Sequence, residues 1–221
     1  ANSPHSITLP GAIKGLERLA LDYSNLGLNA ACAPAIYYAN SGIPVSPRVS
    51  FDWENSKHLL DGKARDFYLQ NGKAPKTGDI FRAPKQAEIL KCIAKEGSSG
   101  LYEGKVAEDI ISSLNKIGGV HTHDDLIKVK CEYVEPISAK INGYNLVELP
   151  PNGQGATALL LGKILEQFKI ENLNPLGYER IHLEAEASKL AYKMRNNEIA
   201  DQSFLKADFD YYYSEDYAKK L

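Results

Sequence analysis

The sequence predicts an α+β fold that is predominantly helical and carries one β-hairpin. Two observations support this: apolar residues recur at helical spacing over most of the chain, and one later stretch alternates apolar and polar residues around an Asn-Gly pair. Apolar residues make up 43% of the 221 positions. That proportion is enough for a sizeable core, in one domain or in a large part of one.

The N-terminal part is predicted to form three helices followed by a loop. Apolar residues recur at helical spacing from Ile13 to Tyr23, directly after Pro10-Gly11, a pair that suits the start of a helix. A second helix is predicted over residues 29–39 and a weaker third over residues 49–60. Residues 61–84 are polar and repeatedly interrupted by glycine and proline, so we expect a loop there.

Two further helices are predicted before the hairpin. Helical spacing resumes over residues 87–94 and again over residues 101–117, and Gly97-Ser98-Ser99-Gly100 separates the two stretches. Gly118-Gly119 follows the second stretch. Glycine takes up the left-handed conformation that commonly ends a helix, so this pair is the expected C-terminal cap.

The hairpin is the clearest β signal. Residues 133–149 alternate apolar and polar side chains on both sides of Asn142-Gly143, and both residues of a tight hairpin turn need positive φ. Pro150-Pro151 ends the second strand, and helices are then predicted over residues 154–168 and 175–195. A two-stranded hairpin is marginal alone, so we expect it to add to a sheet built by other segments.

Composition narrows the classes of function. The formal net charge is −2 and Lys and Arg do not cluster, so we expect no nucleic-acid partner. No run of about 18 apolar residues is present, so no membrane segment is expected. No signal-peptide pattern opens the chain; for a secreted parent protein we expect the signal upstream of Ala1 or already removed. Periplasmic, extracellular and cytoplasmic locations stay open.

Three cysteines and one pair of neighbouring histidines are the candidate metal ligands of the sequence. Cys32, Cys92 and Cys131 are far apart and odd in number, which disfavours a disulfide framework and a zinc site, and we expect buried thiols. His121 and His123 beside Asp124-Asp125 are the most metal-like group. We favour another interpretation, in which Thr122 and Asp125 form a capping box, and we predict no metal site.

Other candidate sites point to structure rather than to chemistry. The loop Pro150–Gly155 is glycine-rich but lacks the nucleotide-binding patterns, so we expect a structural turn, or else the wall of an active site completed elsewhere. Glu184 and Glu186 are predicted on different faces of one helix, which does not support paired-carboxylate catalysis. Tyr211-Tyr212-Tyr213 is interpreted as a packed or interfacial aromatic patch. No cofactor is predicted.

Eight segments, taken in chain order, resemble the large-subunit region of γ-glutamyltranspeptidases. The first four resemble T-V-P-G-A-x-x-G, P-A-I-x-x-A-x-x-G-F-x-V, G-D-x-F-R-x-P and F-Y-x-G-x-x-A-x-x-I, and they stand at Thr8–Gly15, Pro34–Val45, Gly78–Pro84 and Leu101–Ile110. The other four resemble G-G-x-x-T-x-x-D-L, P-I-x-x-x-x-x-G-Y, P-P-x-x-x-G and E-A-x-x-x-A-[FY]-x-x-R, and they stand at Gly118–Leu126, Pro136–Tyr144, Pro150–Gly155 and Glu184–Arg195.

The resemblance implies an N-terminal nucleophile hydrolase with an αββα sandwich. Residues 1–221 would then be a single partial domain, to which a small catalytic subunit from the same self-cleaving precursor is added. The threonine that begins that subunit would attack γ-glutamyl amides such as glutathione and pass the γ-glutamyl group to water or to an amino-acid or peptide acceptor.

No catalytic residue carries over from the family to this chain. Ala1 has no nucleophilic side chain, and Thr8, Thr77, Thr122 and Thr157 do not stand in the family's nucleophile motif. We therefore predict that the isolated chain is inactive. We also expect that its hairpin edge and apolar helix faces need a partner chain.

Two departures from the family pattern affect the choice of substrate. Gln154 precedes a single Gly155 where two glycines are usual, and Met194 stands where the family has Asp before Arg195. One alternative is a related amidase or acylase acting on polyglutamate or on a β-lactam side chain. Another is a non-catalytic helical interaction module.

Overall fold

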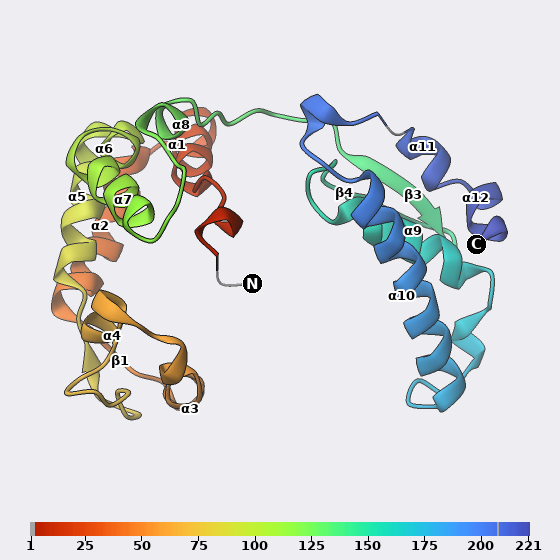
Figure 1. Ribbon diagram of the computed structural model, residues 1–221, viewed down its shortest axis with the longest axis horizontal. Helices are drawn as coiled ribbons and strands as arrows, with labels where there is room; N and C mark the ends of the chain where they lie inside the picture. The colour runs from red at the N-terminus through yellow and green to blue at the C-terminus, as the bar shows by residue number, and fades with distance from the viewer. Residues whose placement is uncertain (1–2, 207) are drawn as a thin grey trace. The chain divides into compact units, whose positions relative to one another are not determined.

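The computed structural model describes residues 3–206 and 208–221 (Figure 1). The backbone separates into two compact units, Ala1–Cys131 and Glu132–Leu221. The single partial domain expected from the sequence stays a prediction.

Unit 1 is built from helices and one pair of very short strands. Its helices are α1 (Ala12–Tyr23), α2 (Gly27–Ser41), α3 (Pro47–Ser56), α4 (Gly62–Tyr68), α5 (Pro84–Glu96), α6 (Ser99–Tyr102), α7 (Gly104–Lys116) and α8 (His123–Ile127). Its strands β1 (Ile43–Pro44) and β2 (Ile80–Phe81) pair antiparallel. These bounds confirm the helices predicted from Ile13 to Tyr23 and over residues 29–39.

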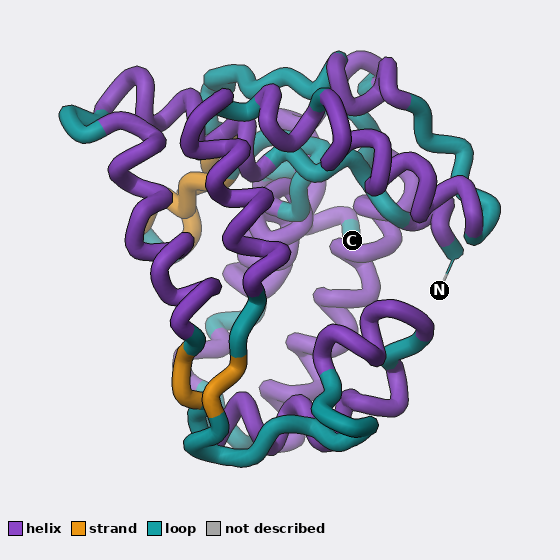
Figure 2. Tube along the Cα trace, turned by 90° about the vertical axis from the view of Figure 1, so that its left-hand side faces the viewer, coloured by secondary structure: helices purple, strands orange, loops and turns teal. Residues whose placement is uncertain are grey.

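Helices α2 and α5 pack along each other, and the strand pair lies at their ends (Figures 1 and 2). The Ala83 N–H donates to the Ala39 carbonyl oxygen at 2.8 Å, which fixes the two helices where β1 and β2 meet. Gly42 has φ +89°, and a Cβ there would lie 2.4 Å from the Ile80 side chain. Only glycine lets the chain turn from α2 into β1 this close to β2.

The loop predicted over residues 61–84 is partly wrong, because this stretch contains α4 and β2. The Asp61 carboxylate accepts from the Gly62 N–H at 2.7 Å at the start of α4, as expected of an N-cap residue. The helix ends in Phe67 and Tyr68, whose rings pack on Phe81 of β2. A helix of seven residues is too short for its spacing to show in the sequence, and aromatic packing supports it instead.

The helix predicted over residues 101–117 is broken into α6 and α7. Gly104 has φ +61°, which interrupts helical geometry between the two. The predicted cap at Gly118-Gly119 is confirmed: the Gly119 N–H donates to the Leu114 carbonyl oxygen at 2.9 Å, and Gly118 has φ +88°. This is the Schellman arrangement of a helix C-terminus. The weak third helix is confirmed as α3, although α3 begins earlier at Pro47 and ends at Ser56, where the 3-10 turn Lys57–Leu59 follows.

The core of unit 1 lies between α6, α7 and α8. Its buried residues are Tyr102, Ala107, Ile111 and Leu126. Tyr102 is 4% exposed, and its hydroxyl donates to the Pro10 carbonyl oxygen at 2.6 Å while accepting from the Lys14 N–H at 3.3 Å. The start of α1 is thereby fixed to α6.

The prediction of buried thiols is wrong for Cys131, and it holds only in part for Cys32 and Cys92. Cys131 is exposed, while Cys32 and Cys92 are half-buried, and all three are free thiols. Cys131 lies at the end of unit 1, in the segment between α8 and the hairpin, outside any helix or strand. Its position in a connecting segment explains its exposure.

Unit 2 consists of a hairpin covered by helices. Its elements are β3 (Ile137–Ile141), β4 (Tyr144–Glu148), α9 (Gly155–Glu166), α10 (Tyr178–Glu198), α11 (Phe209–Tyr212) and α12 (Glu215–Lys220). The predicted turn is confirmed: β3 pairs antiparallel with β4, and Asn142 and Gly143 have φ +47° and +83°. The hairpin forms its own two-stranded sheet, so its addition to a wider sheet stays a prediction.

Helix α9 is the centre of unit 2, since it contacts both the hairpin and α10. Two buried clusters surround it. One contains Leu160, Ile164, Ala187, Ala191, Met194 and Ala218, and the other contains Ala139, Ala156, Leu159 and Tyr213. The predominantly helical α+β class with a hairpin is therefore confirmed. Within residues 3–206 and 208–221, no helix combines the length and the apolar character needed to cross a membrane.

Candidate functional site

The strongest candidate for a functional site is the loop Pro150–Gly155. It joins the hairpin to α9, and both of these elements are packed against each other. Pro151 is buried, and Gly155 begins α9 against the end of β4. A Cβ on Gly155 would lie 2.6 Å from both the Leu149 carbonyl oxygen and the Glu148 Cβ. The structure thus supports the structural interpretation of this loop, in which a glycine lets helix and hairpin approach closely. The active-site wall stays a prediction.

Two hydroxyls in unit 2 are buried without a hydrogen-bond partner among the described residues. Thr157 is 5% exposed and lies in the first turn of α9, and Tyr213 is 7% exposed and packs beside Ala156 and Leu159. Burial, together with the nearby Asp210 carboxylate, raises the pKa of Tyr213 well above its usual range. The Tyr213 hydroxyl therefore stays protonated and uncharged around neutral pH.

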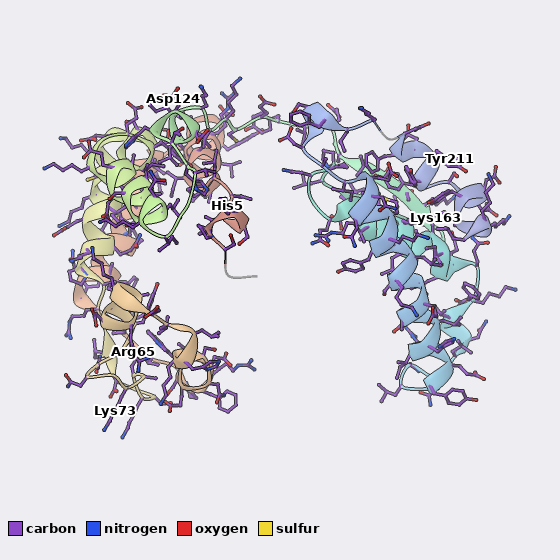
Figure 3. The ribbon with its side chains drawn as sticks, in the orientation of Figure 1. His5, Arg65, Lys73, Asp124, Lys163 and Tyr211 are labelled. Atoms are coloured by element: carbon purple, nitrogen blue, oxygen red, sulfur yellow. The ribbon has the colours of Figure 1, made fainter. Side chains whose placement is uncertain are left out.

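A hydrogen-bonded clamp holds the hairpin turn on α9, and it was not predicted from the sequence. The Lys163 ammonium (labelled in Figure 3) donates to the Lys140 carbonyl oxygen at 2.9 Å and to Glu166 at 2.6 Å. The other oxygen of Glu166 accepts from the Asn142 N–H at 2.8 Å. Lys163, followed by the Asn142 N–H, lowers the pKa of the Glu166 carboxyl, so this acceptor is ionised at neutral pH.

The histidine–aspartate group is structural, as the preferred interpretation expected. Thr122 and Asp125 form a capping box at α8: the Asp125 N–H donates to the Thr122 hydroxyl, and the Thr122 N–H donates to the Asp125 carboxylate at 2.8 Å. The Thr122 hydroxyl and N–H lower the pKa of the Asp125 carboxyl. The His121 Nε2 donates to the Ile7 carbonyl oxygen at 2.8 Å, which ties this turn to the segment before α1.

Metal ligation does not explain this group in the described part of the chain. No set of three or more His, Cys, Asp or Glu side chains gathers there in a way that suits an ion. Asp124, labelled in Figure 3, pairs instead with Lys128 at 3.4 Å. The expected absence of a metal stays a prediction.

The remaining candidates have structural partners. Glu184 accepts from Arg180 Nε at 2.7 Å, and Glu186 pairs with Lys189, so each of these two carboxylates has its own cationic partner. Lys189 lowers the pKa of the Glu186 carboxyl. Two separately paired carboxylates do not form an acid–base pair for glycoside-type chemistry.

The tyrosine patch is packed, as one of the two interpretations expected. Tyr212 and Tyr217 make an edge contact with ring centroids 4.9 Å apart, and Tyr213 is buried. Tyr211, labelled in Figure 3, is 41% exposed and accepts a hydrogen bond from Lys220 at 3.1 Å. Lys220 lies nine residues along the chain, so the sequence next to the three tyrosines does not indicate this contact.

The four threonines lie in different surroundings. Thr8 and Thr77 are exposed outside helices, Thr122 caps α8, and Thr157 is buried in α9. A threonine nucleophile must present its hydroxyl beside a base and within reach of a substrate carbonyl. A buried helical threonine and a capping threonine do not meet that requirement. The absence of a catalytic residue from this chain stays a prediction.

Known proteins share the fold of this chain. Residues 1–221 match the gamma-glutamyltranspeptidase family over their whole length. The chain is 32% identical over 218 residues to the glutathione hydrolase-like YwrD proenzyme of Bacillus subtilis, an alignment that covers 98% of this chain and 42% of that protein. The chain thus spans about two fifths of the length of this relative.

Two solved structures share the fold. Helicobacter pylori gamma-glutamyltranspeptidase superposes with a TM-score of 0.84 at 26% identity, covering 96% of this chain and 62% of that chain. Cephalosporin acylase from Bacillus halodurans superposes with a TM-score of 0.84 at 32% identity, covering 97% of this chain and 41% of that chain. Since the match extends over all 221 residues, the chain belongs to the gamma-glutamyltranspeptidase family.

Proposed function

We propose that this chain is the large-subunit portion of an enzyme that cleaves γ-glutamyl amides and transfers the γ-glutamyl group to water or to an amino-acid or peptide acceptor. The family match over residues 1–221 carries the proposal. Eight ordered sequence motifs support it, as does the likeness to the Helicobacter pylori enzyme.

The chain's own contribution is the framework around the nucleophile. The Lys163–Glu166 clamp and the close approach at Gly155 fix the hairpin on α9. A framework held by buried packing and charged hydrogen bonds keeps an added catalytic group in a constant geometry, which is what covalent catalysis requires. The partner is then a small catalytic subunit from the same precursor. The word proenzyme in the name of the Bacillus subtilis relative supports this.

A second candidate is an acylase that removes the side chain of a β-lactam. The specific support is the 32% identity with cephalosporin acylase from Bacillus halodurans, higher than the 26% with the Helicobacter pylori enzyme. In both candidates an amide carbonyl is attacked by a nucleophile. The two candidates differ in the acyl group that is removed. A γ-glutamyl group carries an α-amino group, whereas a glutaryl group, taken as the example of a β-lactam side chain, lacks it.

A comparison of two substrates distinguishes the two candidate functions. We expect the full-length protein that contains this chain to hydrolyse γ-glutamyl-p-nitroanilide with a kcat/KM at least about tenfold above that for glutaryl-p-nitroanilide, which has the same leaving group. A site that hydrogen-bonds the α-amino group rejects an analogue lacking it by this factor or more. Faster hydrolysis of the glutaryl substrate would instead establish the acylase.

A further inference from the structure

A cavity lined by aromatic rings lies in unit 1 beside α3 and has no part in the proposed function. Its volume is about 380 Å³. It is lined by Val49, Asp52, Trp53, Ser56, Leu60 and Tyr68. This volume falls in the range of small-molecule sites, which are mostly apolar with a few polar groups that orient the ligand. We call it the Trp53 cavity.

The rings of the Trp53 cavity are held in place from three elements. Trp53 of α3 meets Phe81 of β2 edge to face, with ring centroids 4.9 Å apart and ring planes at 68°. It also meets Tyr68 of α4 at 5.9 Å and 66°. Phe67 supports the same cluster at 4.8 Å from Tyr68. Contacts of this type fix ring orientation, so the aromatic wall is formed before any ligand enters.

The charged side chain in the lining of the Trp53 cavity is that of Asp52. Asp52 contributes its carboxylate to the lining, together with the neutral hydroxyls of Ser56 and Tyr68. Arg48 pairs with Asp52 at 2.7 Å, but the two side chains are 82% and 51% exposed. An exposed pair of this kind is weak, and a carboxylate has lone pairs for a second cation. The lining therefore favours a positively charged ligand.

We propose that the Trp53 cavity binds a small organic ammonium ion. The cationic group lies against the Trp53 and Tyr68 rings with Asp52 as its counter-charge, and the carbon body packs on Val49 and Leu60. Tryptophan is the aromatic residue that attracts cations most strongly, and aromatic walls with a carboxylate suit quaternary ammonium groups. An anion would meet Asp52 and is disfavoured. The proposal is independent of the γ-glutamyl chemistry.

The test uses choline and its uncharged analogue 3,3-dimethylbutan-1-ol, which have nearly the same shape. Trp53 is the only tryptophan of the 221 residues, so its fluorescence reports on this cavity alone. Titrating the full chain with choline is expected to change the emission saturably. The neutral analogue is expected to bind about tenfold more weakly, because it lacks the cation–π and carboxylate attractions.

Two matched variants test whether the Asp52 carboxylate is the charge that attracts the ligand. Asp52→Asn keeps the shape of the side chain, and we expect it to weaken choline binding about tenfold and to leave the neutral analogue unchanged. Asp66→Asn removes a carboxylate of α4 that does not line the cavity, and choline binding is expected to stay at the wild-type value. Far-ultraviolet circular dichroism of both variants checks that the fold is kept. No saturable response to choline, equal binding of the two ligands, or equal effects of the two variants would each overturn the proposal.

Discussion

Replacing Gly155 by alanine is expected to lower the free energy of unfolding by about 1–3 kcal/mol, the usual cost of overpacking. The new Cβ would lie 2.6 Å from the Leu149 carbonyl oxygen and 2.6 Å from the Glu148 Cβ. Both atoms belong to the rigid end of the hairpin, so α9 has to move away from β4. The smaller conformational entropy of an unfolded chain with alanine offsets only about 0.4–1 kcal/mol. Denaturant-induced unfolding of the chain measures the difference.

Gly153→Ala is the matched control, because Gly153 belongs to the same loop. The nearest atom to a Cβ there is the Pro150 carbonyl oxygen at 3.7 Å, an ordinary contact. The control is expected to be neutral or slightly stabilising. Equal destabilisation by the two substitutions would show that the loop does not bring helix and hairpin together through Gly155.

Leu159→Ala is expected to cost about 2–5 kcal/mol, the largest effect of any single substitution considered. Leu159 is 0% exposed and packs in a cluster with Ala139, Ala156 and Tyr213. Removing its terminal carbons loses burial and leaves a cavity between α9 and the hairpin. Thermal or denaturant unfolding of the chain measures the loss.

The matched control is Leu176→Ala, since Leu176 is 87% exposed in the same unit. A surface substitution of this kind stays within about 0.5 kcal/mol. A similar loss of stability in both variants would contradict the placement of the core around α9.

Local signals in the sequence predicted the local parts of the fold. Asn142-Gly143 specifies a turn through its own backbone preferences, and the Thr122–Asp125 capping box lies within four consecutive residues. The short elements were missed because distant contacts stabilise them. β1 and β2 are two residues each and pair across a long stretch of chain, and α4 depends on rings of α3 and β2.

The candidate site was predictable only in part, for the same reason. The Pro150–Gly155 loop stands out through its composition, whereas the clamp joins Lys163 to a carbonyl oxygen 23 residues away. No pattern in the sequence indicates that contact. The Trp53 cavity likewise needs Leu60 and Tyr68 to be brought against α3 by the fold. The order of the eight motifs was the signal that pointed to the family.

The proposal that this chain needs a partner from its own precursor is tested most directly by a paired assay. The full-length precursor is expected to appear as two chains by intact mass spectrometry and to release p-nitroaniline from γ-glutamyl-p-nitroanilide. The 221-residue chain alone is expected to release none above the uncatalysed rate. Turnover by the isolated chain, or an uncleaved and inactive full-length protein, would contradict the account.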